Sequence, residues 1–337
     1  MKVSIIITNY NYQDFVRECI DSCLNQTYKN IEIIVVDDGS TDNSRFVLNE
    51  YEDSVKLVFQ ENAGMVQASN TGYAYATGDL IIFLDADDFL KEKALENVVN
   101  VCEKDTVKIH FKLEKQNNNG DILGIVPSEG FNLSEGNVWS EILKRGDYNN
   151  VPTSGNVYSK KILDQIFPIL DSKIGDGNSY LDSFPTDSFL KYRIPFYGSV
   201  KAIQEPMGVY RVHGDNNGYK VSSYLNDKKR KRILTIAKLN TNFINSKLNI
   251  NNFNAFYKRV RIIRCVALSY RLEGYDPIWE TKNKTVLFFK LTYFLILSIK
   301  FKVLSLCYNI FLIFLILFSS KKNSSKKLKI LFKNKKL

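Results

Sequence analysis

The first ninety residues alternate short apolar runs with helical periodicity. Val3 to Ile7 and Ile31 to Val36 are apolar runs, and between them apolar side chains recur every three or four residues from Phe15 to Leu24. A short apolar run is typical of a buried strand, and the spacing in between is typical of an amphipathic helix. The pattern predicts a strand–helix–strand unit with parallel strands.

The alternation continues with strands predicted at Val55 to Phe59 and Leu80 to Leu84, and with a helix from Gly64 to Ala76 between them. We therefore expect an α/β fold in which helices flank a mostly parallel central sheet. From about residue 105 to 220, loops rich in Asn, Gly and Pro separate shorter strands. These strands are predicted at 107–113, 155–158, 200–203 and 208–212.

Two of the predicted strands end in carboxylates. The strand that ends at Val36 leads into Asp37 and Asp38, and the strand that ends at Leu84 leads into the acidic stretch 85–88. Ligands of parallel sheets bind beyond the carboxyl ends of the strands. Crowded acids at such an edge repel one another unless a cation or hydrogen-bond donors meet them. We expect the acids at both strand tips to hold one divalent cation.

The nucleotide motifs that depend on glycine are missing. The turn after the first strand contains no glycine, so it lacks the G-x-G-x-x-G signature of a dinucleotide fold, and Gly39 stands alone after the second strand. There is also no P-loop lysine motif. A diphosphate bound at this edge needs a metal held on the acids to neutralise it.

Charge and cysteine usage narrow the class of protein. The 337 residues include 46 Lys and Arg against 36 Asp and Glu, but thirteen Lys follow Glu280 with no acid among them. The body up to that residue is mildly acidic, which argues against nucleic-acid binding. Five cysteines without a CxxC pair favour a reducing, cytoplasmic setting over a disulfide framework or zinc site. Because Met1 and Lys2 lead directly into a strand, we expect no signal peptide.

Four stretches of the chain together resemble the inverting family 2 glycosyltransferases of the GT-A fold, and these are residues 3–11, 30–42, 62–64 and 78–88. The resemblance is specific over residues 1 to about 90 and looser over 180–216. It implies that Asp87, the second acid of the family's DxD motif, binds Mn²⁺ or Mg²⁺ bridging the diphosphate of a nucleotide-diphospho-sugar, with a UDP-sugar as the expected donor. The donor-binding residues that it implies are Thr8, Tyr10, Asp38, Asn62, Gly64, Asp85 and Ala86.

The general base follows from a second matching stretch. Residues 185–190 resemble the start of the family's helix in which Glu is followed by the catalytic Asp, and this implies Asp187 as the base. Asp182 is the alternative. The chain departs from the family pattern at Thr186, where Glu is usual, and at Ser69, where many members carry Arg.

Residues 208–213 resemble the family's terminal Tyr-Arg-x-His segment, which implies that His213 completes the metal shell. Each assignment has a structural alternative. Asp38 in its Asp-Gly-Ser turn and Asp187 before an apolar pair are also typical helix caps, and a lone histidine is more often structural than a ligand.

The C-terminal segment predicts contact with a membrane. Residues 303–318 carry no charge, an apolar run at 286–299 precedes them, and eight Lys follow between 321 and 336. A helix of sixteen residues is about 24 Å long, short of the ~30 Å hydrocarbon core, and the positive-inside rule keeps the tail cytoplasmic. We expect helices in the cytoplasmic leaflet and lysines on anionic lipid, a membrane-associated extension of the GT-A domain. A soluble helical pair or a dimer contact is the alternative.

These expectations combine into one function. The chain is interpreted as a metal-dependent transferase at the inner face of a bacterial membrane, adding a sugar to a saccharide or lipid-linked acceptor in cell-surface polysaccharide synthesis. A polyprenyl-phosphate glycosyltransferase and a non-catalytic sugar-nucleotide-binding protein are the alternatives. The predicted organisation is a nucleotide-sugar half (1–105), an acceptor and catalytic half (106–220), a helical segment (221–280) and the hydrophobic, basic end (281–337).

Overall fold

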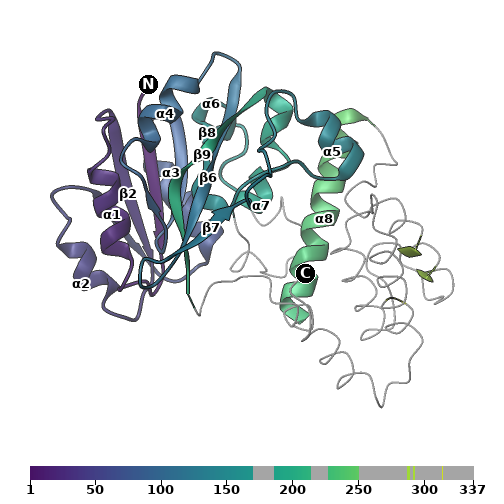
Figure 1. Cartoon of the computed structure of the whole chain (residues 1–337). Coiled ribbons are helices and arrows are strands. Elements are labelled where there is room, and N and C mark those ends of the chain that lie inside the picture. Colours follow the sequence, from purple (N-terminus) through teal and green to yellow (C-terminus); the bar gives the residue numbers. More distant parts are fainter. Residues whose placement is uncertain (170–185, 214–226, 250–286, 289–290, 293–312, 314–337) are drawn as a thin grey trace. The chain divides into compact units, whose positions relative to one another are not determined.

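The computed structural model describes residues 1–169, 186–213 and 227–249, together with five residues between 287 and 313 (Figure 1). The chain divides into two units. The first comprises Met1–Ser140 and Tyr148–Asn216, and the second comprises Glu141–Asp147 and Asn217–Leu337. The predicted site residues that the structure describes all belong to the first unit.

Up to residue 90, the predicted strands and helices are confirmed with ends that agree to within two residues. In chain order the elements are β1 (Val3–Asn9), α1 (Val16–Leu24), β2 (Ile31–Asp38), α2 (Ser44–Asn49), β3 (Lys56–Gln60), α3 (Met65–Tyr75), β4 (Leu80–Asp85), β5 (Phe89–Leu90), α4 (Ala94–Val101), β6 (Thr106–Asn117), β7 (Ile122–Val126), α5 (Trp139–Arg145), η1 (Thr153–Gly155), β8 (Asn156–Ser159), α6 (Lys160–Leu163), α7 (Thr186–Leu190), η4 (Ile194–Tyr197), β9 (Ser199–Val212) and α8 (Asp227–Leu248).

One mixed sheet organises the first unit (Figure 1). Its strand order within the described residues is β3-β2-β1-β4-β8-β6-β9-β5, and β7 pairs with β6. The run from β3 to β4 is parallel, as predicted. Beyond β4 the direction varies, because β8 runs antiparallel to both β4 and β6, while β6 and β9 are parallel. The carboxyl ends of β1, β2 and β4 therefore share one edge.

Helices cover both faces of the parallel strands. Ile5 and Ile7 of β1 belong to one buried cluster with Cys19 of α1, and Ile6 points to the opposite face, as the two-residue period of a strand requires. On that face α3 packs against β1 and β2. The approach is so close that a Cβ on Gly72 would lie 2.4 Å from Cγ2 of Ile6. A larger residue at this position would push α3 away from the sheet.

The two strands predicted at 200–203 and 208–212 are in fact one, and this prediction was wrong. β9 is a single strand that runs parallel to β6 through Pro206. Pro206 has no N–H to donate, and the pairing register shifts on both sides of Lys112, where β6 faces it. Because these irregularities absorb the proline, β9 continues without a break and carries the chain to His213 at the edge that holds the acids.

Several predictions fall outside the described residues. These are Asp182, nearly all of the apolar runs at 286–299 and 303–318, and the lysine-rich tail. In the part of the chain that the structure describes, we find no helix that is both long enough and apolar enough to cross a bilayer.

Candidate active site

A tight turn after β4 brings three carboxylates together. The backbone N–H of Asp88 donates to the carbonyl of Asp85 at 3.0 Å, which closes the turn around the buried Ala86. As a result, one carboxylate oxygen from each of Asp85, Asp87 and Asp88 lies within 4.8 Å of the others. The acidic cluster that the sequence predicts after β4 is confirmed, and we call these three residues the acid triad.

Asp88 holds the acid triad to the rest of the sheet. Its carboxylate accepts hydrogen bonds from Ser154 Oγ at 2.6 Å and from the backbone N–H of Arg211 at 3.0 Å. Ser154 lies in η1 and Arg211 in β9, so this side chain joins the turn to two other elements. The sequence predicted Asp88 as one of the acids after Leu84, but not its contacts, because its partners are far away along the chain.

Negative charge in the triad is only partly compensated by the protein. Burial raises the pKa of Asp85 well above its usual range, and the charges of Asp87 and Asp187 raise it further. Burial and the same neighbour, Asp87, also raise the pKa of Asp88, although bonds from Ser154 and Arg211 act in the opposite direction. A cation among these oxygens would relieve both effects.

The oxygen and nitrogen atoms gathered here fit a divalent metal ion. Mg²⁺ and Mn²⁺ both prefer carboxylate oxygens as ligands, and Mn²⁺ also accepts imidazole. His213 follows β9 directly, and its Nε2 lies 2.9 Å from Oδ2 of Asp87. Its ring stacks on Phe15 with centroids 5.0 Å apart. The structure thus brings the two predicted metal ligands, Asp87 and His213, into direct contact.

The side chain of Arg211 supports the same turn. Its Nε donates to the backbone carbonyl of Asp87 at 3.0 Å, and a terminal nitrogen contacts Glu18 at 2.5 Å. The guanidinium lies 5.2 Å from the ring centroid of Phe15 and 5.3 Å from that of Phe89. Arg211 therefore braces the backbone of the turn.

The acids at the tip of β2 do not join the triad, which corrects the prediction that both pairs hold one cation. β1 lies between β2 and β4, so the two tips are about 10 Å apart at the usual strand spacing. Asp37 is fully buried and accepts bonds from Asn9 Nδ2 at 2.9 Å and Arg45 Nε at 3.0 Å. Its charge is met by the protein itself.

Asp38 shapes the loop after β3. Its carboxylate accepts three hydrogen bonds, from Gln60 Nε2 at 2.7 Å and from the backbone N–H groups of Ala63 at 2.9 Å and Gly64 at 2.8 Å. Gly39 adopts a φ of 75°, and a Cβ there would meet the backbone nitrogen of Asn62 at 2.6 Å. The predicted donor residues Asp38, Asn62 and Gly64 therefore form one connected loop.

The remaining predicted donor residues lie at the end of β1. Thr8 pairs in register with Asp85 of β4, which places it beside the acid triad. Tyr10 follows β1 and is 44% exposed, so its ring is free to meet a ligand. A cavity of about 480 Å³ adjoins the donor loop, with Gly39 and Asn62 in its lining.

Asp187 is the second residue of α7 and only partly exposed. Burial raises its pKa, while the positive charges of Lys191 and Lys108 oppose that effect. Since Asp187 also raises the pKa of Asp85, the two carboxylates are close enough to interact. The structure thus brings the predicted base and the acid triad to one region.

A buried polar group near Asp187 was not predicted. Lys108 of β6 is fully buried and donates to Tyr148 at 2.8 Å and to Asn150 Oδ1 at 2.5 Å. Its neighbour His110 lies 2.8 Å from the carbonyl of Ser134, and burial, with the charge of Lys108, lowers the pKa of His110 to about 3. Alternating polar residues in an otherwise apolar strand were the available signal.

The two departures from the family pattern touch each other. Ser69 Oγ of α3 and Thr186 Oγ1 of α7 are 2.7 Å apart, and each residue is 1% exposed. The residues are 117 positions apart along the chain. Sequence reasoning identified both positions but not their contact.

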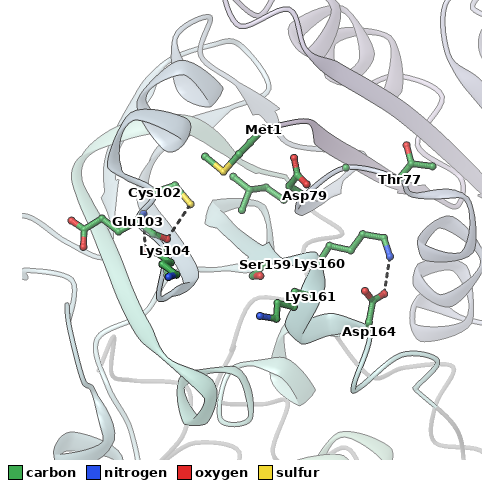
Figure 2. A pocket seen from close by; sticks show the side chains of 13 residues that line it. Met1, Thr77, Asp79, Cys102, Glu103, Lys104, Ser159, Lys160, Lys161 and Asp164 are labelled. Atoms are coloured by element: carbon green, nitrogen blue, oxygen red, sulfur yellow. Dashed lines mark hydrogen bonds and ion pairs between the residues drawn. The ribbon is translucent and has the colours of Figure 1, made fainter.

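A second cavity, of about 440 Å³, lies at the opposite edge of the sheet (Figure 2). Leu80 and Thr106, the first residues of β4 and β6, help to line it, whereas the acid triad begins at Asp85, the last residue of β4. Lys160 in this cavity pairs with Asp164 at 2.7 Å. The cavity is therefore separate from the candidate active site.

The fold is that of the GT-A glycosyltransferases. The crystal structure of S. aureus TarS 1-349 aligns with a TM-score of 0.51 at 16% identity and covers 88% of this chain and 81% of that chain. A second TarS structure, determined with UDP, aligns with a TM-score of 0.50 at 16% identity over 80% of this chain and 72% of that chain. At this identity the likeness establishes the fold alone.

The sequence identifies the family. The model of glycosyl transferase family 2 matches residues 4–164. An uncharacterized glycosyltransferase of Nostoc sp. is 37% identical over 237 residues, which are 68% of this chain and 71% of that protein. The chain belongs to glycosyl transferase family 2, and the resemblance inferred from its motifs is confirmed.

A further relative has a specific activity in its name. WfgD of Escherichia coli, a UDP-Glc:alpha-D-GlcNAc-diphosphoundecaprenol beta-1,3-glucosyltransferase, is 40% identical over 124 residues. The match covers 36% of this chain and 49% of that protein, so it extends over about half of WfgD.

Proposed function

We propose that this glycosyltransferase moves a sugar from a nucleotide-diphosphate donor to a hydroxyl of a saccharide or lipid-linked acceptor, with inversion, in cell-surface polysaccharide synthesis. One observation carries the proposal: three crowded, incompletely compensated carboxylates lie close to a separate carboxylate, Asp187. The first group suits a metal and a diphosphate, and the second suits a general base.

The donor lies across the ends of β1, β2 and β4. Tyr10 offers an exposed ring to the base, and the loop held by Asp38 borders the nucleoside. Asp38 already accepts three bonds, which leaves room for about one more on a carboxylate that can accept four. The full donor set is Thr8, Tyr10, Asp38, Asn62, Gly64, Asp85 and Ala86.

Asp87 and His213 would hold Mn²⁺ or Mg²⁺, and a bound ion would neutralise the charge that develops on the departing diphosphate. Asp88 and Arg211 keep the turn in place, so that the oxygens of Asp85 and Asp87 face one position. The stacked ring of Phe15 holds the imidazole of His213 in its orientation.

Asp187 takes the proton of the acceptor hydroxyl as that oxygen attacks the anomeric carbon. The hydroxyl approaches from the side opposite the diphosphate, so one displacement inverts the centre and no covalent enzyme intermediate forms. Lys108 and Lys191 favour the ionised form of Asp187 against its burial. That ionised form is the one able to accept a proton.

The name of WfgD supports a UDP-sugar as the donor and a diphosphoundecaprenol-linked saccharide as the acceptor. A lipid-linked acceptor agrees with the predicted position at the cytoplasmic face of the membrane, held through residues 281–337 on anionic lipid. In this scheme residues 1–105 bind the donor, residues 106–220 bind the acceptor and supply the base, and residues 221–280 connect them to the membrane segment.

The test is transfer by the purified chain of 337 residues with Mn²⁺, a panel of UDP-sugars and GlcNAc-diphosphoundecaprenol. We expect a product heavier by one sugar, and an Asp187→Asn variant that transfers about 10³-fold more slowly yet binds UDP as the wild type does. Asp164→Asn, a matched change at an exposed ion pair, should remain active.

Each other outcome has a defined meaning. Full activity of Asp187→Asn would remove that residue from the mechanism. Transfer to polyprenyl phosphate without a saccharide would replace the proposed acceptor. UDP binding without turnover on any donor and acceptor would show a sugar-nucleotide-binding protein instead of a catalyst.

A further inference from the structure

The contact between Ser69 and Thr186 has a defined direction. The hydroxyl of Ser69 donates to the carbonyl of Met65 one turn earlier in α3, at 2.8 Å. A serine hydroxyl has only one hydrogen, so the hydroxyl of Thr186 donates to Ser69 Oγ across the 2.7 Å contact. Both residues are 1% exposed, so removing either hydroxyl would leave the other without this bond and without water in its place.

The next residue of α3 makes a similar link. Nδ2 of Asn70 donates to the carbonyl of Ile169 at 2.9 Å, and Oδ1 of Asn70 accepts from the N–H of Ile169 at 2.8 Å. Two successive residues of α3 thus hold Ile169 and Thr186, which lie on either side of residues 170–185. Helix α3 is itself packed on β1 and β2, which supply the donor side of the site.

Helix α7 is too short to fix its own position. It spans five residues, Thr186–Leu190, and isolated helices of that length do not form in water. Its placement therefore depends on contacts with other elements. Just after its end, the hydroxyl of Tyr148 donates to the carbonyl of Lys191 at 3.1 Å. At its start, Thr186 contacts Ser69 of α3.

We infer that Ser69 and Thr186 are positioning residues, whose buried hydroxyl pair seats the first turn of α7 on α3 and so places the carboxylate of Asp187 against the acceptor hydroxyl. The inference rests on the proposed role of Asp187 as the base. Thr186 immediately precedes Asp187, so a shift at the start of α7 moves the carboxylate directly. A displacement of about 1 Å at a reacting group is enough to cost about 100-fold in rate.

The experiment compares kcat and KM in variants that remove or keep the hydroxyl. In Thr186→Val and in Ser69→Ala we expect kcat to fall about 10- to 100-fold while KM for the UDP-sugar changes less than about twofold. Thr186→Ser keeps the donor and should retain kcat within about threefold. The double variant Ser69→Ala with Thr186→Val should lose no more than the worse single variant, because both remove one bond.

Thr106→Val is the matched control, because Thr106 is also a buried threonine with a bonded hydroxyl but lies at the start of β6. Its kcat should equal that of the wild type. Wild-type kcat in folded Thr186→Val and Ser69→Ala would overturn the inference, as would losses that add in the double variant. If Thr186→Val fails to fold, Ser69→Ala decides the question, since it leaves the shape of α7 intact.

Asp187→Asn separates this inference from the proposed function. An inactive Asp187→Asn with fully active Ser69→Ala and Thr186→Val would refute positioning and leave the base in place. An active Asp187→Asn would refute the proposed base, and any loss in the other two variants would then have to come from elsewhere in the site.

Discussion

Two groups of acids at one edge of the sheet look alike in the sequence and differ in the structure. Asp37 and Asp38 at the end of β2 are surrounded by hydrogen-bond donors from the protein, including Arg45 and the backbone of the loop after β3. Asp85 at the end of β4 and Asp87 in the turn that follows lie among other carboxylates instead.

Crowding in the acid triad has an electrostatic consequence. Burial and neighbouring charge raise the pKa of Asp85 and of Asp88. The carboxylates at the end of β2 are structural anchors, because hydrogen-bond donors of the protein satisfy their charge in the folded chain. Acids at the ends of parallel strands can therefore serve as structural anchors or as ligands, and the supply of hydrogen-bond donors decides between the two roles.

The largest effect is expected on activity at the triad. Asp87→Asn removes a proposed metal ligand and should slow transfer by about 10³-fold, because stabilisation of the departing diphosphate would be weakened. The same change relieves like-charge repulsion, so the melting temperature should stay the same or rise. Initial rates with Mn²⁺ and thermal melts test both parts. A variant with at least a tenth of wild-type activity would contradict the assignment.

The opposite behaviour is expected at the tip of β2. Asp38→Ala leaves two backbone N–H groups and an amide without their acceptor, and should destabilise the fold by about 3 kcal/mol. Urea unfolding measures this free energy. Asp53→Ala, at an exposed position, should change stability by less than about 0.5 kcal/mol. If Asp38→Ala were as stable as Asp53→Ala, Asp38 would not be a structural anchor.

A divalent ion should stabilise the protein through the triad alone. At a Mn²⁺ concentration about 100 times its dissociation constant, binding adds about 2.7 kcal/mol to the free energy of unfolding. Thermal melts of the wild type should therefore shift upward with Mn²⁺, and those of Asp87→Asn should shift much less. The same upward shift in both proteins would place the ion elsewhere.

The smallest effect is expected at His110, a buried histidine that stays neutral in the folded protein. Its folded pKa of about 3 lies below the usual value of 6.5, so the unfolded chain binds the proton first as pH falls. Above pH 6.5 His110 is neutral in both the folded and the unfolded chain, so it has no effect on stability. The free energy of unfolding falls as the pH decreases from 6.5 to 3, and the loss is about 2 kcal/mol at pH 5.

Comparison with His110→Asn isolates this contribution. The difference in unfolding free energy between wild type and variant should move by about 2 kcal/mol against the wild type between pH 7.5 and 5. Urea unfolding at both pH values provides the measurement. A difference that stays constant with pH would show that His110 is not held neutral.

Much of the donor half was predictable from the chain alone. The apolar runs that became β1, β2 and β4 are local patterns, because a strand buried on both faces needs apolar residues throughout. The position of the acids after β2 and β4 followed from those runs. The resemblance to a known family also held, because its motifs lie in continuous stretches of sequence.

The acceptor side was harder to predict, because its elements are defined by pairing. β9 continues through Pro206 only because β6 shifts register beside it, and nothing local to residues 199–212 signals that compensation. Lys108 is buried because Tyr148 and Asn150 meet it, and both come from a distant loop.

By itself the sequence determined most of the strands and helices up to residue 90, where the acids stand at the ends of those strands, and to which family the chain belongs. Only the tertiary structure decided which acids find donors, which crowd together, and that Ser69 meets Thr186. Periodicity along a chain reports which face of an element is buried. A hydrogen bond or a charge cluster depends on where separate elements come to rest, and that is settled by packing across the whole sheet.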